Sequence, residues 1–124
     1  MTFHDLALTA PLQRAVEAIG YDTPTPIQQQ AIPAVLAGRD LLGCAQTGTG
    51  KTAAFGLPIL QQIEHSTEGV QSIILVPTRE LAVQAAEELL SYNRERRLSI
   101  TAIYGGAAMG EQLRRLSRGV DIVV

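Results

Sequence analysis

The sequence predicts an α/β fold in which a parallel sheet is covered by helices on both faces. From residue 40 onward, short apolar segments alternate with stretches whose apolar residues recur at helical spacing. The apolar segments are almost continuously hydrophobic, which is typical of strands that are buried on both faces. At 124 residues the chain is one domain or part of one.

Residues 1–38 are expected to form a helical segment that precedes the alternating part. One helix is expected between Thr9, a suitable N-cap, and Gly20, a suitable stop. A second helix is expected from Thr25 to Gly38, because a cap residue is followed by proline at the first helical position. Pro33 is expected to kink or divide it.

Residues 39–124 are expected to contain the sheet and its helices. The expected strands are 40–44, 71–76, 99–104 and 121–124. The expected helices are 53–64, 110–118 and one that is capped by Thr78 and buries Leu81, Ala85, Leu89 and Tyr92. Because the chain stops inside the fourth strand, the domain is predicted to be truncated.

The composition excludes several classes of protein. Hydrophobic content of 46% with 18% charged residues indicates a globular chain, and a net charge of −2 gives no bulk attraction to nucleic acid. The single cysteine, Cys44, excludes an internal disulfide, and we interpret it as a buried strand residue. No stretch reaches the ~20 apolar residues of a membrane span, so a soluble, cytoplasmic protein is expected.

The chemistry is concentrated in a glycine-rich loop between an expected strand and an expected helix. Such a turn directs backbone N–H groups toward an anion at the positive end of the helix. Lys51 would reach the β- and γ-phosphates of a nucleotide, and the Thr52 hydroxyl would join the shell of Mg²⁺. The candidate nucleotide-binding residues of the loop are Ala45, Gln46, Thr47, Gly48, Thr49, Gly50, Lys51 and Thr52.

Two other interpretations of this loop are possible. Gly48, Gly50 and Ala53 also fit a dinucleotide-binding fingerprint, and the loop could be a plain glycine turn. A dinucleotide loop would place its first glycine directly after the strand, whereas Gln46 and Thr47 intervene here. The lysine and threonine at the helix start favour the phosphate loop, although Ala45 replaces its usual first glycine.

Two further stretches have both a structural and a functional interpretation. Gln28 can complete a capping box with Thr25, or its amide can read adenine. Thr78 is a good N-cap, but Arg79 opposes the helix dipole unless a phosphate binds at the same end. The arginines at 94, 96, 97, 114, 115 and 118 are interpreted as solvated charges.

Together these stretches resemble the N-terminal part of a DEAD-box ATP-dependent RNA helicase, most closely the bacterial members. The motifs that carry the resemblance are GYDTPTPIQ (20–28), AQTGTGKT (45–52), PTRELA (77–82) and a glycine doublet (105–106). Phe3 lies where this family places an isolated aromatic residue, and alanine at the start of the loop is characteristic of it. The resemblance implies that residues 39–124 are the first part of a RecA-like domain, incomplete at its end.

The resemblance also implies which residues bind which ligand. ATP with Mg²⁺ would be bound by Phe3, Tyr21, Gln28 and the loop, with Lys51 and Thr52 as catalytic residues and Thr52 facing the metal. RNA would be bound through its backbone, with little sequence preference, by Pro77, Thr78, Arg79, Gly105 and Gly106.

The resemblance also bears on activity. The sequence does not contain the family's Asp-Glu-Ala-Asp motif, so these residues are expected to bind nucleotide without hydrolysing it. Because the strand that should carry this motif is missing, an apolar strand or its face is expected to be uncovered, and the chain is expected to self-associate. The alternatives are a non-catalytic nucleotide-binding module and a phosphate-loop ATPase that acts on DNA or protein.

Overall fold

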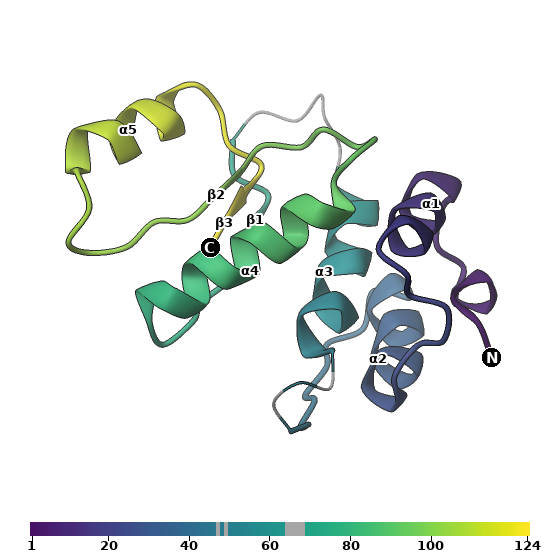
Figure 1. Cartoon of the computed structure of the whole chain (residues 1–124). Coiled ribbons are helices and arrows are strands. Elements are labelled where there is room, and N and C mark those ends of the chain that lie inside the picture. Colours follow the sequence, from purple (N-terminus) through teal and green to yellow (C-terminus); the bar gives the residue numbers. More distant parts are fainter. Residues whose placement is uncertain (47, 49, 64–68) are drawn as a thin grey trace.

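The computed structural model describes residues 1–46, 48, 50–63 and 69–124, and Figure 1 shows the chain. The N-terminal segment forms a short 3-10 helix, η1 (Phe3–Leu6), and two α-helices, α1 (Ala10–Ala18) and α2 (Pro26–Leu36). Thr9 and Thr25 are the N-caps of the two α-helices, as predicted. Helix α2 runs through Pro33 without being divided.

The remaining elements alternate between helix and strand. They are α3 (Lys51–Gln62), β1 (Ser72–Ile73), α4 (Arg79–Tyr92), β2 (Ile100–Thr101), α5 (Met109–Ser117) and β3 (Ile122–Val123). Three of the predicted strands are therefore present, but each is shorter than expected. Helix α3 begins two residues earlier than expected, and the predicted end at Glu64 lies outside the described residues.

The strands form a parallel sheet in the order β1-β3-β2, which confirms the predicted fold class. Ser72 and Ile100 both pair with Ile122, so the central strand is the last one in the sequence. Because all three strands run in the same direction, their carboxyl ends meet at one edge. The segments that follow β1 and β2 consequently leave the sheet at this edge, on either side of β3.

Helix α4 packs against the sheet, α3 and α1, and α3 packs against α2 (Figure 1). The contact between α3 and α4 is close at Gly56, where an added Cβ would lie 2.5 Å from Cδ2 of Leu89. Leu57, Leu60 and Leu89 are completely buried at this contact and belong to a hydrophobic cluster that also includes Phe3 near the N-terminus. On the sheet, Ile73 and Leu75 are 68% and 90% exposed, so the helical cover does not extend over this part.

The predicted buried strand at 40–44 is wrong. Among the described residues these five form no strand, Leu42 is 95% exposed and Cys44 is exposed. The apolar run would be buried only between neighbouring strands, and β1, β3 and β2 pair with one another instead.

The predicted buried face of α4 is also partly wrong. Leu81 is 42% exposed, while Ala82 and Ala86 are buried together with Leu89 and Tyr92. Small alanines at these positions allow the helix to approach its neighbours closely, and Leu81 falls on the side that faces away.

Candidate functional site

The start of α3 has the features of an anion site. Gly48 and Gly50 adopt left-handed backbone conformations with φ of 84° and 82°, which glycine adopts at little cost. Gly50 is the N-cap and offers no side chain, and the first turn of α3 contains no acidic residue. No side chain of that turn therefore accepts a hydrogen bond from the first N–H groups of the helix or neutralises the positive end of its dipole. Thr47 and Thr49 lie outside the described residues.

Gln28 connects this loop to the start of α2. Its Oε1 accepts a hydrogen bond from the backbone N–H of Thr25 at 3.0 Å, which forms the predicted capping box. Its Nε2 donates to the carbonyl oxygen of Gly50 at 3.1 Å. The oxygen and the nitrogen of this 3% exposed side-chain amide thus each have a partner within the protein. A Cβ on Gly50 would lie 2.2 Å from Nε2, so only glycine permits the contact.

A pocket of about 330 Å³ lies beside Gln28, and we call it the Gln28 pocket. Its lining residues are Tyr21, Thr23, Thr25, Gln28, Gly48, Gly50 and Glu88. The structure therefore brings together the upstream motif, the glycine loop and a helix that lies far along the sequence.

Tyr21 is the aromatic side chain of this pocket. It is 39% exposed, whereas Phe3 is only 2% exposed and lies behind it, with the two rings stacked at a centroid distance of 6.3 Å. Phe3 is absent from the pocket lining. Phe3 therefore stays a predicted nucleotide-binding residue, and in this structure its ring stacks on Tyr21, which lines the pocket.

Glu88 is a pocket residue that lies outside every motif found in the sequence analysis. Its Oε2 is buried and has no hydrogen-bond partner within the described part of the chain. Burial, with the negative charge of Glu88 nearby, raises the pKa of Tyr92. The only signal in the sequence is the position of Glu88 beside Leu89, which places a carboxylate at the margin of the buried face.

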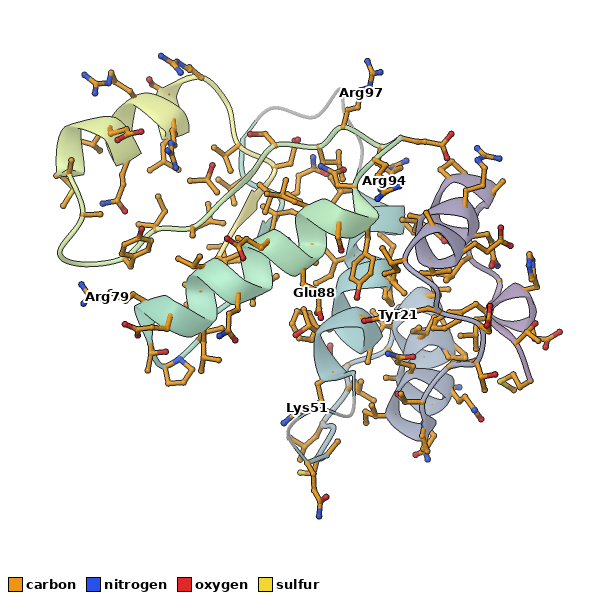
Figure 2. The ribbon with its side chains drawn as sticks, viewed as in Figure 1. Tyr21, Lys51, Arg79, Glu88, Arg94 and Arg97 are labelled. Carbon is orange, nitrogen blue, oxygen red and sulfur yellow. The ribbon has the colours of Figure 1, made fainter. Side chains whose placement is uncertain are left out.

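Lys51 lies on another side of the loop. It is exposed and lines a second pocket, of about 310 Å³, with apolar residues such as Ile27, Leu41 and Phe55. Thr52 follows it in the first turn of α3 and is half-buried, while Ala45 is half-buried and Gln46 exposed before the loop. Figure 2 shows Lys51 near the start of α3, with Tyr21 and Glu88 farther up between α4 and the N-terminal helices.

A second candidate site lies at the carboxyl edge of the sheet. A cavity of about 430 Å³ is lined there by Pro77, Thr78, Arg79 and Gly105, among others. Gly106 adjoins it, since an added Cβ would lie 3.2 Å from Nη1 of Arg79. All five residues predicted to bind RNA are thus brought to one place by the parallel sheet.

The start of α4 explains the geometry of this second site. Thr78 caps the helix by accepting a hydrogen bond from the N–H of Leu81 at 3.1 Å, as predicted. The Arg79 guanidinium is 3.2 Å from the carboxylate of Glu80, and both side chains are more than half exposed. The arginine is therefore held loosely at a positive helix end and is open to an anionic ligand.

Within the described ranges, no three His, Cys, Asp or Glu side chains gather to form a metal site. No described helix is long and apolar enough to cross a membrane.

A parallel α/β sheet and a glycine loop that enters an uncapped helix define the class of phosphate-loop domains. The sequence profile described as DEAD/DEAH box helicase matches residues 25–124. The chain belongs to this family.

Sequence and structure comparisons with similar proteins support this family membership. The chain is 44% identical to the DEAD-box ATP-dependent RNA helicase CshA of Bacillus licheniformis, over all of the chain and 26% of the relative. It is 49% identical to the ATP-dependent RNA helicase DeaD of Escherichia coli, over 99% of the chain and 20% of the relative. The crystal structure of a DEAD box protein from Methanococcus jannaschii superimposes with a TM-score of 0.95 and 38% identity, over all of the chain and 34% of that protein. The chain thus spans about a quarter of the length of the curated relatives.

Proposed function

We propose that the chain is the part of an ATP-dependent RNA helicase that binds the nucleotide and contacts the RNA backbone. The observation that carries the proposal is the uncapped start of α3, joined to the Gln28 pocket through the contact between Gly50 and Gln28. One nucleotide could occupy both features, with its phosphates at the start of α3 and its base in the Gln28 pocket.

The phosphates would bind to the first N–H groups of α3, with Lys51 turning from its exposed position to the β- and γ-phosphates. The hydroxyl of Thr52 and phosphate oxygens suit Mg²⁺, which keeps several waters and takes few protein ligands. When bound, the ion would neutralise the charge that the β- and γ-phosphates share. Lys51 and Thr52 are accordingly the proposed catalytic residues.

The base would bind in the Gln28 pocket against Tyr21. An aromatic face that is exposed on one side and supported by Phe3 on the other is well placed for stacking. Gln28 would keep the loop in place through Gly50, and adenine is the base that its motif indicates. Phe3 would act indirectly, by fixing the ring of Tyr21.

RNA would bind at the carboxyl edge of the sheet. The guanidinium of Arg79, the N-terminus of α4 and the backbone around Gly105 and Gly106 offer contacts to phosphate and carry no information on sequence. In the complete protein such contacts would hold single-stranded RNA while ATP is used to separate a short duplex.

We also propose that these 124 residues do not hydrolyse ATP by themselves, because their sequence contains no Asp-Glu-Ala-Asp motif to hold Mg²⁺ and orient water. A non-catalytic nucleotide module is therefore an adequate description of the chain in isolation. Phosphate release in the presence of ATP, Mg²⁺ and RNA measures this directly, and turnover that RNA stimulates would contradict it.

The binding proposal is tested by calorimetry with ADP and ATP on the wild-type chain and on Lys51→Ala. We expect the variant to lose nucleotide binding while its melting temperature stays the same or rises slightly, because a cation at a helix start opposes the dipole by about 0.3–1 kcal/mol. Arg39→Ala, which removes another exposed cation, is the matched control and is expected to bind normally. Nucleotide affinity that survives in Lys51→Ala would contradict the proposal.

A further inference from the structure

Helix α5 buries a polar side chain and leaves its apolar side chains in solvent. Gln112 is the only buried residue of α5, all of which is among the described residues. It is 7% exposed, whereas Met109 and Leu113 of the same helix are 68% and 57% exposed. Figure 1 shows α5 set apart from the other helices. Because glutamine is usually found at the surface, its burial here requires a reason other than hydrophobic packing.

The reason is a pair of hydrogen bonds between Gln112 and the backbone of Tyr104. The N–H of Tyr104 donates to Oε1 of Gln112 at 3.0 Å, and Nε2 of Gln112 donates to the carbonyl oxygen of Tyr104 at 3.3 Å. The N–H of the preceding residue, Ile103, points the other way and donates to the carbonyl of Val124. Among the described strands β2 pairs with β3 alone, so the groups of Tyr104 lie at the open edge of the sheet. The amide of Gln112 therefore bonds to this edge as a neighbouring strand would.

These two bonds fix the chain immediately before the glycine doublet at 105–106. Gly106 has a left-handed backbone conformation with φ of 86°. A Cβ added to Gly106 would lie 3.2 Å from Nη1 of Arg79, so the turn passes directly beside the arginine at the start of α4. The turn begins at Tyr104 and leads into α5, which carries Gln112. Gln112 thus ties together the two ends of the turn that contains the glycines.

We propose that Gln112 is a positioning residue for RNA binding, which holds the glycine turn beside Arg79 without touching RNA itself. This inference rests on the proposed RNA site at the carboxyl edge of the sheet. Consecutive glycines have more backbone freedom than any other pair of residues, so a turn that is not held adopts many conformations. Affinity for a ligand falls in proportion to the fraction of molecules that have the binding conformation. Holding the turn in place therefore raises the affinity for RNA.

The experiment compares the wild-type chain with Gln112→Met, which keeps the length of the side chain and a good helix former but removes both hydrogen bonds. We expect the amide proton of Tyr104 to exchange faster in the variant, as NMR-detected hydrogen exchange measures. Affinity for single-stranded RNA, measured by fluorescence anisotropy, should fall roughly tenfold, as the loss of one to two neutral hydrogen bonds implies. Gln84→Met, the same change at an exposed position of α4, should alter neither quantity.

Two further measurements distinguish a positioning role from a direct contact with RNA. Gln112 carries no charge, so the slope of log affinity against log salt should be the same in Gln112→Met as in wild type, whereas Arg79→Ala should reduce it by about one. In Gly106→Ala the new Cβ crowds Arg79 and the backbone conformation is unfavourable, so the turn is already displaced. Adding Gln112→Met to that variant should therefore cost little further RNA affinity.

The outcomes separate this inference from the proposed RNA site. If wild type binds no RNA, the site and the inference fail together. If wild type binds RNA through Arg79 but Gln112→Met binds it equally well, the positioning role alone is overturned. Additive losses in the double variant, or an equal loss of ADP affinity in Gln112→Met, would indicate a general structural defect and would also overturn it. If Gln112→Met does not fold, Gln112→Asn, whose amide is on a shorter side chain, is tested with the same expectations.

Discussion

Gln28 joins the start of α2 to the loop before α3 through a single amide. It completes the capping box with Thr25 and also bonds to the carbonyl of Gly50. The structural role of these two bonds and the proposed role in nucleotide binding therefore fall on one side chain, and any change of Gln28 is expected to alter both. The sequence alone presents these roles as alternatives, because the contact with Gly50 spans 22 positions.

We expect Gln28→Ala to lower stability as well as nucleotide affinity. Loss of the reciprocal cap and of a buried hydrogen bond should reduce the free energy of unfolding by about 1–3 kcal/mol, since the Gly50 carbonyl loses its partner. Denaturant unfolding with and without ADP measures both effects. Gln29→Ala is the control: Gln29 donates to the carbonyl of Pro24 at 2.9 Å and does not line the pocket, so its loss should change stability and affinity less. An unchanged unfolding midpoint for Gln28→Ala would contradict the structural role.

Arg79 is expected to contribute to RNA affinity without contributing to sequence preference. Arg79→Ala should weaken binding of single-stranded RNA uniformly across sequences and reduce the slope of log affinity against log salt by about one. Fluorescence anisotropy at several salt concentrations measures both quantities. Arg94→Ala removes an exposed arginine beyond the opposite end of α4 (Figure 2) and should leave the affinity and the slope unchanged. Equal effects of the two variants would indicate nonspecific attraction.

The packing of α3 on α4 depends on the glycine at position 56. Gly56 faces Leu89, which is fully buried, and the helices approach too closely there for a side chain on α3. Because α3 carries the loop and α4 carries Glu88 and Arg79, this contact positions both candidate sites relative to each other.

Gly56→Ala is expected to destabilise the chain by about 1–3 kcal/mol, because a Cβ at 2.5 Å from Leu89 must push the helices apart. Gly110→Ala in α5 is expected to have the opposite effect on stability. No atom lies within 4 Å of its added Cβ, so the better helix propensity of alanine should stabilise the chain by up to ~1 kcal/mol. Thermal unfolding of the two variants should therefore shift in opposite directions. A stable Gly56→Ala would show that the helices can separate without cost.

At the scale of the whole molecule, the distribution of apolar surface is uneven. Leu42 and Leu75 are 95% and 90% exposed and Ile73 is 68% exposed, while the leucines between α3 and α4 are completely buried. Exposed apolar side chains on segments with free backbone edges favour association between chains.

We expect the chain to self-associate at high concentration and the double variant Leu42→Ser, Leu75→Ser to do so less. Both side chains are almost fully exposed, so the melting temperature of the monomer should change little. Sedimentation velocity over a concentration series measures the association. Gln84→Ser, an exposed polar position on α4, serves as the control. A strictly monomeric wild type would contradict this prediction.

The sequence by itself determined the features that depend on neighbours along the chain. The caps at Thr9, Thr25 and Thr78 and the parallel α/β pattern were predicted because caps and periodicity are local properties. The motifs also indicated the residues that meet at the carboxyl edge of the sheet, since parallel strands bring their ends together.

Only the tertiary structure decided which side chains are covered and which face a pocket. The run at 40–44 is as apolar as a buried strand, yet burial requires strand partners, and its leucines are exposed among the described residues. Phe3 and Tyr21 are both aromatic, but packing put Phe3 behind Tyr21. The sequence analysis assigned no role to Glu88, and this residue lines the Gln28 pocket because α4 packs beside α3. Contacts between residues this distant in sequence depend on the three-dimensional arrangement of helices, which no local pattern specifies.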